Sequence, residues 1–432
     1  MSKALRGLGV LAAAMLPLMS GIPVAAAIPP PVIDPNVPPP ADGPPGPEIP
    51  MEQRNYCQVS ILQPGTDPHA VSEAQRFMQL PQLWETVGKG AGVSVALIDT
   101  GVTPSARLPH LHGGGDYVTG GDGLSDCDAH GTSVAAVIAG APAEDDAFSG
   151  VAPDAEVISI RQETAAFAPV GARPSIIESD KALIHTMARA IVHAADSGAK
   201  VIVASLPQCF PARRPVDQSQ LGAAIRYAAV DKDAVVVASA GNVGAECGHN
   251  PDEDQPGSAQ DPRNWNGVNL ISTPGWFDDY VLTVGSPDDF SLMGPWVDVA
   301  APASGITSIS PEGALVDAYD NAPDAPNPLW GTSFSAAYVA GLAALIRSKH
   351  PELTAAQVIE RITSTAKNPA GHVDNKLGHG MIDPLAAVGA VPQRAPEAPE
   401  PAHNTGLVIG ATASLAVLVL GGGALWWRRR RA

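Results

Sequence analysis

The segment Val93-Ser-Val-Ala-Leu-Ile-Asp-Thr-Gly-Val102 sets the fold class of this chain. Residues 93–98 are apolar at all but one position and rich in branched side chains, which is typical of a strand buried on both faces of a parallel sheet. Asp99 follows this strand directly. In open α/β sheets, binding and catalytic groups gather beyond the carboxyl ends of the strands. Asp99 is therefore a candidate functional residue.

The same pattern recurs through one block, residues 70–390, where apolar runs alternate with segments of helical period. Strands are expected at Val93–Ile98, Val157–Arg161, Val201–Ser205, Val235–Ser239 and Val281–Val284. Helices are expected at Ala182–Ser197, Leu221–Ala229, Ser335–Lys349 and Ala355–Thr365, the last opening with the capping box Thr354-Ala-Ala-Gln357. This alternation predicts an α/β domain with a mostly parallel sheet and helices on both faces.

The first 27 residues have the three parts of a secretory signal peptide. Lys3 and Arg6 supply the positive start, Gly7–Met19 is apolar, and Ala25-Ala-Ala27 is a small-residue cleavage site. The apolar run is too short to span a bilayer. We expect the mature chain to begin near Ile28.

The C-terminal end has a different pattern. Residues 406–427 carry no charge and are long enough to span a membrane. Trp426 and Trp427 stand where interface aromatic residues belong, and Arg428–Arg431 follow at once. Because clustered arginines stay on the cytoplasmic side, we expect a transmembrane helix over 406–427, a cytoplasmic tail over 428–432, and the main body outside.

Two proline-rich segments flank the central block. Residues 28–69 form an N-terminal extension, and prolines in residues 28–50 exclude a helix or a paired strand. That part is either a polyproline-like spacer or an irregular wrap. Residues 391–405 are expected to be a tether between body and anchor. The net charge of −18 argues against nucleic acid as a partner, because phosphate binding needs a basic surface.

Two further segments carry chemistry, Asp128-Ala-His-Gly-Thr-Ser-Val134 and Gly331-Thr-Ser-Phe-Ser335. A serine hydroxyl is a poor nucleophile until an imidazole takes its proton and a carboxylate orients that imidazole. Ser333 precedes an apolar helix, whose N-terminus favours a developing oxyanion. Asn242, just after an expected strand, is a candidate second donor. Taken alone, Asp99 also fits a turn, His130 a surface histidine and Ser333 a helix cap. Together, the three residues predict a serine hydrolase.

Other interpretations of the polar residues are weaker. A metal site of His110, His112, Cys127 and His130 lacks a helical His-Glu-x-x-His motif. The acidic clusters Glu144–Asp146 and Asp252–Asp254 lack a calcium-ligand loop and fit solvated loops better. His112-Gly-Gly-Gly115 is expected to be a flexible surface loop near the cleft. No cofactor or metal is expected.

The chain resembles the subtilisin-like serine proteases over nearly all of residues 90–390. The matching motifs are Asp99-Thr-Gly, His130-Gly-Thr, Gly331-Thr-Ser333, Ser239-Ala-Gly-Asn242 and Ala204-Ser-Leu206. The resemblance implies a three-layer subtilisin-like fold, and it implies a role for each matched residue. These are catalytic Asp99, His130 and Ser333, the oxyanion donor Asn242, and the substrate-binding residues Ser205 and Leu206. Three positions depart from the family pattern: Ser133, Pro207 and Ala337.

The order of segments resembles that of the mycosins, membrane-anchored subtilases of actinobacterial type VII secretion. This resemblance implies a catalytic domain on the extracytoplasmic side of the cell membrane, protein or peptide substrates, and a secretion membrane complex as partner. It also implies that the extension wraps the domain instead of acting as a removable inhibitor. The alternative is a structural subunit that docks onto the complex and for which the triad is dispensable.

Four cysteines in an exported chain predict two disulfides, and the sequence alone leaves three pairings open. Cys209 follows strand 201–205 and Cys247 follows strand 235–239 in the expected fold. If these strands are neighbours, both cysteines emerge at one face of the sheet, which favours Cys209–Cys247. Cys57–Cys127 would then be the second pair and would hold the extension near His130.

Overall fold

The computed structural model describes residues 28–389, apart from 215, 245–246, 252–257, 259–260 and 321–325. The predicted signal peptide, tether, transmembrane helix and tail lie outside these residues, as does the acidic cluster Asp252–Asp254. Among the described residues, no helix combines the length and apolar character that a membrane span requires.

A seven-stranded sheet in the order β12-β11-β9-β7-β3-β5-β4 forms the centre of the domain, and every neighbouring pair in it is parallel. Its strands are β12 (Val299–Ala300), β11 (Val281–Gly285), β9 (Val235–Ser239), β7 (Val201–Ala204), β3 (Ser94–Asp99), β5 (Glu156–Arg161) and β4 (Leu111–Asp116). The expected mostly parallel α/β fold is confirmed.

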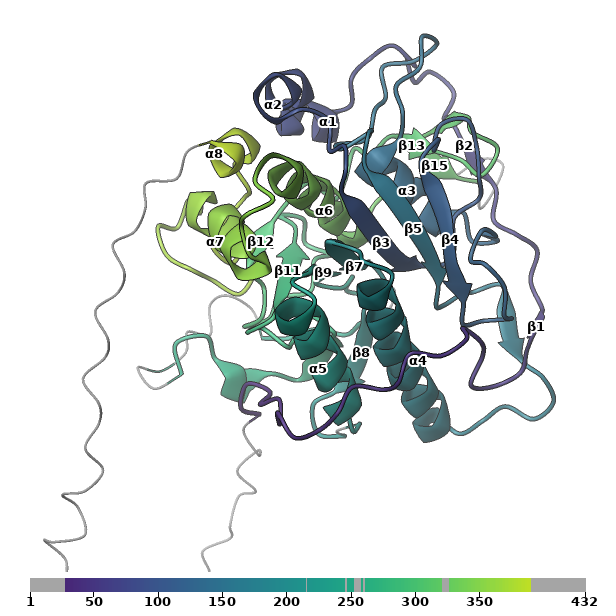
Figure 1. The fold of residues 1–432 in the computed structure, drawn as a ribbon, viewed down its shortest axis with the longest axis vertical. Coiled ribbons are helices and arrows are strands. Elements are labelled where there is room, and N and C mark those ends of the chain that lie inside the picture. Colours follow the sequence, from purple (N-terminus) through teal and green to yellow (C-terminus); the bar gives the residue numbers. More distant parts are fainter. Residues whose placement is uncertain are drawn as a thin grey trace, which may run out of the picture. The chain divides into compact units, whose positions relative to one another are not determined.

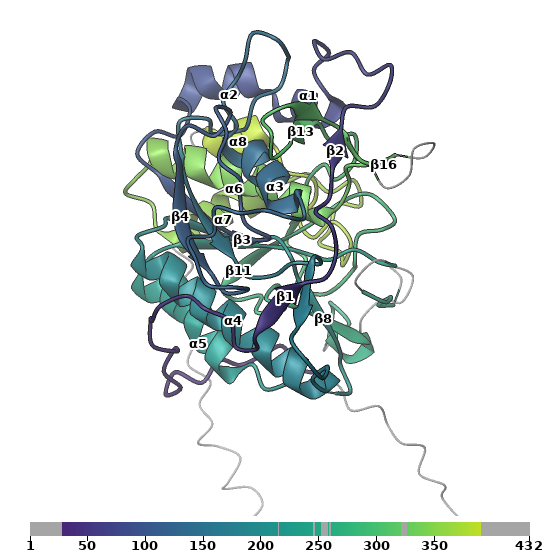
Figure 2. The same cartoon turned by 90° about the vertical axis from the view of Figure 1, so that its right-hand side faces the viewer.

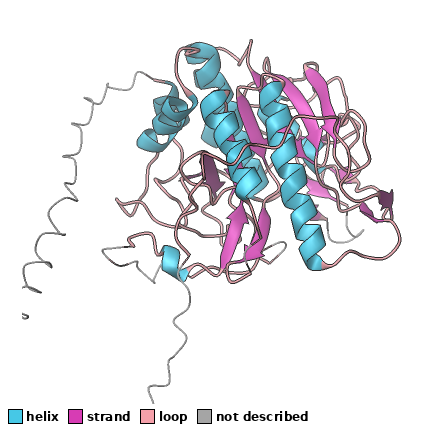
Figure 3. Ribbon diagram, turned by 60° about the horizontal axis from the view of Figure 1, so that its bottom comes forward, coloured by secondary structure: helices cyan, strands magenta, loops and turns pink. Residues whose placement is uncertain are grey.

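Helices cover both faces of this sheet (Figures 1 and 3). One face carries α4 (Ile176–Asp196) and α5 (Ser219–Arg226), the latter continuing into a π-helical turn, Tyr227–Asp231. The other face carries α3 (His130–Ala139), α6 (Thr332–Lys349), α1 (Glu73–Met78), α2 (Leu80–Val87), α7 (Ala355–Thr365) and α8 (Pro384–Val388). The central helix α6 is buried along almost its whole length, so the sheet and this helix form the core.

Alternate residues of β3 pack on opposite faces of the sheet. Val95 and Leu97 pack in the cluster that contains α3 and α6. Ala96 and Ile98 pack in the cluster that contains α4 and α5. Successive side chains of a strand point to opposite faces, which explains why this strand is apolar at consecutive positions.

The remaining strands are short and antiparallel. They are β1 (Met51–Gln53) with β6 (Phe167–Pro169), β8 (Gln208–Pro211) with β10 (Leu270–Thr273), β13 (Ser308–Ile309) with β14 (Leu315–Val316), and β15 (Ala318–Tyr319) between β2 (Ser60–Ile61) and β16 (Asn327–Pro328). A 3-10 turn lies at Trp265–Gly267. Both β1 and β2 belong to the N-terminal extension and attach it to the domain.

The expected loop at His112-Gly-Gly-Gly115 is wrong, because these residues lie in the edge strand β4. His112 and Gly113 pair with β5, and the register shifts between Gly113 and Asp116. The glycines allow close approach on this edge. A Cβ on Gly114 would lie 2.5 Å from Ile158 Cγ2, and one on Gly115 would lie 2.3 Å from Pro45 Cγ. Glycine at this edge therefore reflects packing under the extension rather than mobility.

The proline-rich part of the extension runs across α4 and α5 (Figures 1 and 2). Arg189 of α4 binds the Glu48 carboxylate at 2.9 Å and the Pro44 carbonyl at 2.8 Å. One turn further on, His193 Nδ1 lies 2.9 Å from Asp42 Oδ1. Of the two forms expected for residues 28–50, the segment from Asp42 to Glu48 adopts the irregular wrap.

Candidate active site

Asp99 ends β3 and is almost completely buried. Its Oδ1 accepts a hydrogen bond from the Thr100 N–H at 2.6 Å, and its Oδ2 accepts one from the Ser205 hydroxyl. Burial alone would raise the pKa of the Asp99 carboxyl. The His130 charge and the hydrogen bonds from His130, Ser205 and Thr100 outweigh burial and hold this pKa below its ordinary value. Asp99 is therefore a fixed anion at the carboxyl edge of the sheet.

His130 is the first residue of α3, and the left-handed backbone of Ala129 (φ 56°) turns the chain into that helix. His130 Nδ1 lies 2.8 Å from Asp99 Oδ1 and 3.0 Å from Asp99 Oδ2. Its Nε2 lies 3.0 Å from Ser333 Oγ. One imidazole thus bridges a carboxylate and a hydroxyl that lie 234 residues apart in the sequence (333 minus 99).

Ser333 occupies the first turn of α6, where backbone N–H groups have no partner within the helix. Asn242 lies beside this turn, and its Oδ1 accepts from the Thr332 N–H at 2.9 Å and the Thr332 hydroxyl at 3.2 Å. These bonds fix the amide group. A Cβ on Gly331 would lie 3.3 Å from both Asn242 Nδ2 and Ser333 Oγ. Gly331 therefore leaves open the space between the amide and the hydroxyl.

The two expected substrate-binding residues lie in different surroundings. Ser205 is buried, and its hydroxyl donates to the Asp99 carboxylate and to the Ile98 carbonyl, the latter at 3.2 Å. Leu206 lines a cavity beside His130. The Ser205 side chain thus faces the Asp99 carboxylate, whereas Leu206 lines the cavity.

A second buried carboxylate lies behind His130, and sequence reasoning missed it. Asp126 Oδ2 accepts from the Thr132 N–H at 2.8 Å and the Thr132 hydroxyl at 2.6 Å. Its Oδ1 accepts from the Thr100 hydroxyl at 2.9 Å and the Asp128 N–H at 3.0 Å. Burial raises the pKa of Asp126 to about 6, although the Thr132 bonds act against this rise. The sequence did contain a signal for this contact. Asp126 is followed six residues later by Thr132, which lies at the start of a helix.

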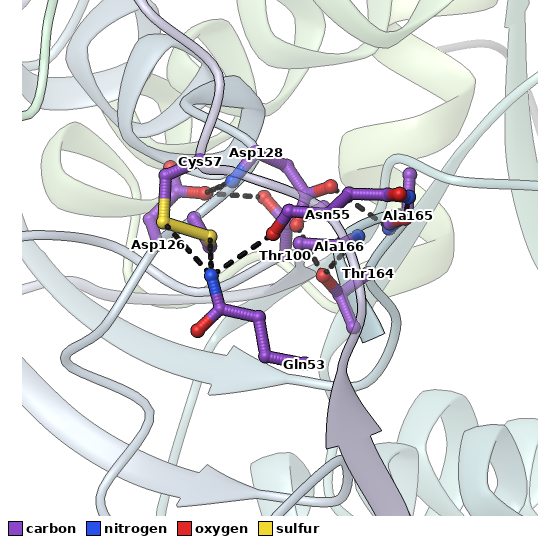
Figure 4. Close-up of a disulfide and its surroundings, with 10 residues drawn as sticks. Gln53, Asn55, Cys57, Thr100, Asp126, Asp128, Thr164, Ala165 and Ala166 are labelled. Carbon is purple, nitrogen blue, oxygen red and sulfur yellow. Dashed lines mark hydrogen bonds between the residues drawn. A yellow bond between two sulfur atoms is a disulfide. The ribbon is translucent and has the colours of Figure 1, made fainter. Parts of the chain in front are cut away.

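The extension reaches the site through a disulfide (Figure 4). Cys57 is bonded to Cys127, three residues before His130, and the Gln58 N–H donates to the Cys127 carbonyl at 2.7 Å. Cys209 is bonded to Cys247. Both pairs are those that the strand argument favours, and β7 and β9 are indeed neighbours.

The weaker interpretations of the polar residues do not fit this geometry. Cys127 is in a disulfide and His130 bonds Asp99 and Ser333, so neither serves a metal site with His110 and His112. In the described ranges, no three metal-ligating side chains form a group that could hold an ion. Asp146 is not solvated as expected, because Arg107 binds its carboxylate at 2.6 and 3.2 Å in a nearly buried ion pair.

Two of the three departures from the family pattern, Ala337 and Ser133, leave these contacts intact. Ala337 is fully buried in α6. The Ser133 hydroxyl donates to the Ile309 carbonyl at 3.3 Å, and its own carbonyl accepts from the Ser308 hydroxyl at 2.6 Å. Ser133 therefore joins α3 to β13.

Comparison with known proteins gives a consistent result. Residues 90–380 match the family described as "Subtilase family". Mycosin-3 of Mycobacterium tuberculosis (strain ATCC 25618 / H37Rv) is 46% identical over 430 residues, which cover 92% of this chain and 92% of the relative. The solved MycP3 protease of the type VII (ESX-3) secretion system has a TM-score of 0.80 and 50% identity, covering 84% of this chain and all of that one.

A chain of an intact ESX-5 inner membrane complex is also similar, with a TM-score of 0.79 and 44% identity. The match covers 93% of this chain and 100% of that chain. With the family match over two thirds of its length and relatives of this identity, the chain belongs to the subtilase family of serine endopeptidases and, within it, to the mycosins of type VII secretion.

Proposed function

We propose that this chain hydrolyses peptide bonds of exported proteins with Ser333 as nucleophile, His130 as general base and Asp99 as the group that orients His130. The observation that carries the proposal is the continuous hydrogen-bonded path from the Asp99 carboxylate through both nitrogens of His130 to Ser333 Oγ, at 2.8 and 3.0 Å. These distances are within the reach that proton transfer requires.

Each group has a distinct part in the reaction. Ser333 Oγ attacks the scissile carbonyl while His130 Nε2 takes its proton, and His130 later gives that proton to the leaving amine. Water then hydrolyses the acyl-enzyme by the same route. The ionised Asp99 stabilises the imidazolium that forms, and the Ser205 hydroxyl positions this carboxylate.

The oxyanion of the tetrahedral intermediate is expected between Asn242 Nδ2 and the Ser333 N–H. Thr332 supplies two donors to Asn242 Oδ1, so the amide hydrogens face the other way. Donors fixed before the reaction stabilise developing charge without reorganisation. The backbone at Ser205 and the side chain of Leu206 are proposed to border the bound peptide, since Leu206 lines the cavity beside His130.

A fluorophosphonate probe tests this function, because it reacts with a serine only when the base and oxyanion donors are assembled. The purified full-length chain should be labelled on Ser333, and a Ser333→Ala variant should not. Equal thermal unfolding of the two proteins would exclude misfolding as the cause. Absence of labelling in the folded, disulfide-bonded chain would contradict the proposal.

For its cellular setting, we propose a single-pass protein of the cell membrane: a signal peptide over 1–27, a tether over 391–405, a transmembrane helix over 406–427 and a cytoplasmic tail over 428–432. The catalytic domain would lie on the extracytoplasmic side. Support comes from the apolar C-terminal sequence and from the ESX-5 inner membrane complex that contains a similar chain. Protease added to intact cells should digest the domain and leave the tail protected.

A second function, docking as a structural subunit, is favoured by the same similarity to a chain within a membrane complex. Complementation of a deletion strain separates the two functions. If Ser333→Ala restores export as well as the native chain does, docking is the essential function. If it restores complex assembly without processing of an exported protein, both functions are present.

A further inference from the structure

Asp99 and His130 belong to different elements of the fold. Asp99 is the last residue of β3, and His130 is the first residue of α3. The loop after β3 and the start of α3 meet without a side chain between them. A Cβ on Gly131 would lie 2.1 Å from the Gly101 carbonyl oxygen and 2.9 Å from Asp99 Oδ1. A group that fixes these two backbones against each other therefore also fixes the contact between Asp99 and His130.

Asp126 lies where the two backbones meet and accepts hydrogen bonds from both. On the side of β3, its Oδ1 accepts from the Thr100 hydroxyl at 2.9 Å (Figure 4). On the side of α3, its Oδ2 accepts from the Thr132 N–H at 2.8 Å and from the Thr132 hydroxyl at 2.6 Å. Thr100 directly follows Asp99, and Thr132 comes two residues after His130. One carboxylate thus joins the segment of the triad acid to the segment of the triad base.

The two threonine hydroxyls extend this connection, because each accepts a hydrogen bond while it donates to Asp126. The Thr100 hydroxyl accepts from the Gly131 N–H at 2.9 Å, and the Thr132 hydroxyl accepts from the Thr103 N–H at 3.0 Å. A backbone N–H can only donate, so the direction of each bond is fixed. The network therefore needs an acceptor at both oxygens of residue 126, which an ionised carboxylate supplies and an amide does not.

Burial makes each of these contacts costly to lose. Asp126, Thr100 and Thr132 are all buried. A buried donor that loses its acceptor keeps the full cost of its removal from water. The arrangement of the two segments is therefore strongly coupled to the acceptor capacity of Asp126.

We propose that Asp126 is a positioning residue of the triad, whose carboxylate holds the loop after β3 and the start of α3 in the arrangement that brings Asp99 to His130. Asp126 acts through Thr100 and Thr132 and is not itself a catalytic residue. The proposal rests on the proposed function, because it concerns how fast Ser333 is activated. Misplacing a catalytic group by about 1 Å can lower a rate by about 100-fold.

The rate at which a fluorophosphonate probe labels Ser333 in the full-length chain tests the proposal. Asp126→Asn preserves the size of the side chain and removes one of its two acceptors. It should lower the maximal inactivation rate constant, kinact, by about 100-fold. The apparent affinity for the probe, KI, should stay within about twofold, because the lost arrangement matters in the transition state. The measurement is made at about pH 8, where Asp126 is ionised, since burial raises its pKa to about 6.

Asp146→Asn is the matched control, because Asp146 is a nearly buried carboxylate at the opposite end of α3. It accepts from Arg107 at 2.6 and 3.2 Å and from the Phe148 N–H at 3.0 Å. Arg107 also donates to the carbonyl of Ala141, two residues after α3 ends. Asp146→Asn should lower the melting temperature and leave kinact unchanged, because it loosens the end of α3 that does not carry His130.

A second pair of variants tests the same connection with Asp126 intact. Thr100→Val keeps the shape of the side chain but removes the hydroxyl between Gly131 and Asp126, so kinact should fall about tenfold. Thr100→Ser retains the hydroxyl and should recover most of that loss. Adding Thr100→Val to Asp126→Asn should lower kinact by less than about threefold more, because the connection is already broken.

Equal kinact for the native chain and Asp126→Asn would overturn the proposal. Equal losses in Asp126→Asn and Asp146→Asn would also overturn it, because they would reflect general destabilisation. If Asp126→Asn fails to fold, the Thr100 pair decides, and equal kinact for Thr100→Val and Thr100→Ser would overturn the proposal. Failure of the proposed function has a different signature, since the native chain itself would then not be labelled on Ser333.

Discussion

The active-site edge of the sheet and the N-terminal extension are held by different kinds of interaction. At the sheet edge, Asp99, His130 and Ser333 are joined by short hydrogen bonds between buried or nearly buried groups. The extension is held by one disulfide, two short strand pairings and ion pairs open to solvent, such as Arg189 with Glu48.

The difference shows where single substitutions should matter. Buried polar groups depend on their partners, so the loss of one leaves another unsatisfied at a cost of roughly 1–3 kcal/mol. Solvent-exposed ion pairs contribute about 0–1 kcal/mol each. The extension therefore depends mainly on its covalent bond, whereas the site depends on every member of its network.

The largest effect is expected for the triad. His130→Ala should lower kcat for peptide hydrolysis by about 10⁴-fold or more, because Ser333 loses its base. The extension should stay attached, with unchanged resistance to added protease, since the disulfide and the strand pairings that hold it do not include His130. A small loss of kcat would mean that another group activates Ser333.

The second-largest effect is expected for the Cys57–Cys127 disulfide, which joins the extension to the active-site edge of the sheet. Replacing Cys57 and Cys127 by serine opens a crosslink spanning 70 residues and should cost about 4 kcal/mol in free energy of unfolding, measured by urea denaturation. The matched control replaces Cys209 and Cys247, which span 38 residues, and should cost about 0.5 kcal/mol less. Only the first variant should expose the segment near Cys57 to proteolysis; cleavage in the control instead would contradict this division.

Because of Asp126, the contribution of the active site to the free energy of unfolding should depend on pH, whereas the contribution of the extension should not. Its folded pKa of about 6 exceeds its ordinary value of 3.8, so the folded state binds more protons and stability falls as pH rises from about 4 to 6. That loss is about 3 kcal/mol. Asp99 acts in the opposite direction: its lowered pKa adds stability that is lost only as pH falls below 3.8.

The Asp126→Asn variant checks this assignment by urea unfolding at pH 4, 5 and 6.5. At pH 4 it should be less stable than the native chain by about 1–2 kcal/mol. The reason is that the side-chain amide of asparagine replaces one of the two oxygen acceptors of Asp126 by an NH₂ group, and Asp126 Oδ2 accepts from two donors of Thr132. The deficit should shrink as pH rises, since the variant has no carboxylate to ionise. A deficit that stays constant would show that Asp126 is ionised throughout.

The smallest effect is expected at the surface of α4. Arg189→Ala removes the ion pair with Glu48, the bond to the Pro44 carbonyl and a cation–π contact with Tyr117. We expect a loss of about 1 kcal/mol or less. Limited proteolysis should cut faster between Asp42 and Glu48 while peptide hydrolysis is unchanged; a loss of activity would mean that this part of the extension supports the site.

Much of the site could be predicted because its signals are local in sequence. The apolar run before Asp99 predicts the strand that positions Asp99, and the small residues after His130 predict the helix that positions His130. The roles of Asp126 and of the Ser205 hydroxyl could not be predicted. Each depends on a partner in another element, with Ser205 reaching Asp99 across neighbouring strands.

By itself, the sequence determined the strand and helix alternation of the domain, the order of the triad motifs and the charge-free segment 406–427, because periodicity and spacing are properties of a single segment. Only the tertiary structure decided that His112–Gly115 is an edge strand, that the extension follows α4, and that Asp128 and Glu163 line one cavity. These features depend on which distant backbones approach each other, and that is settled by packing against the sheet rather than by local pattern.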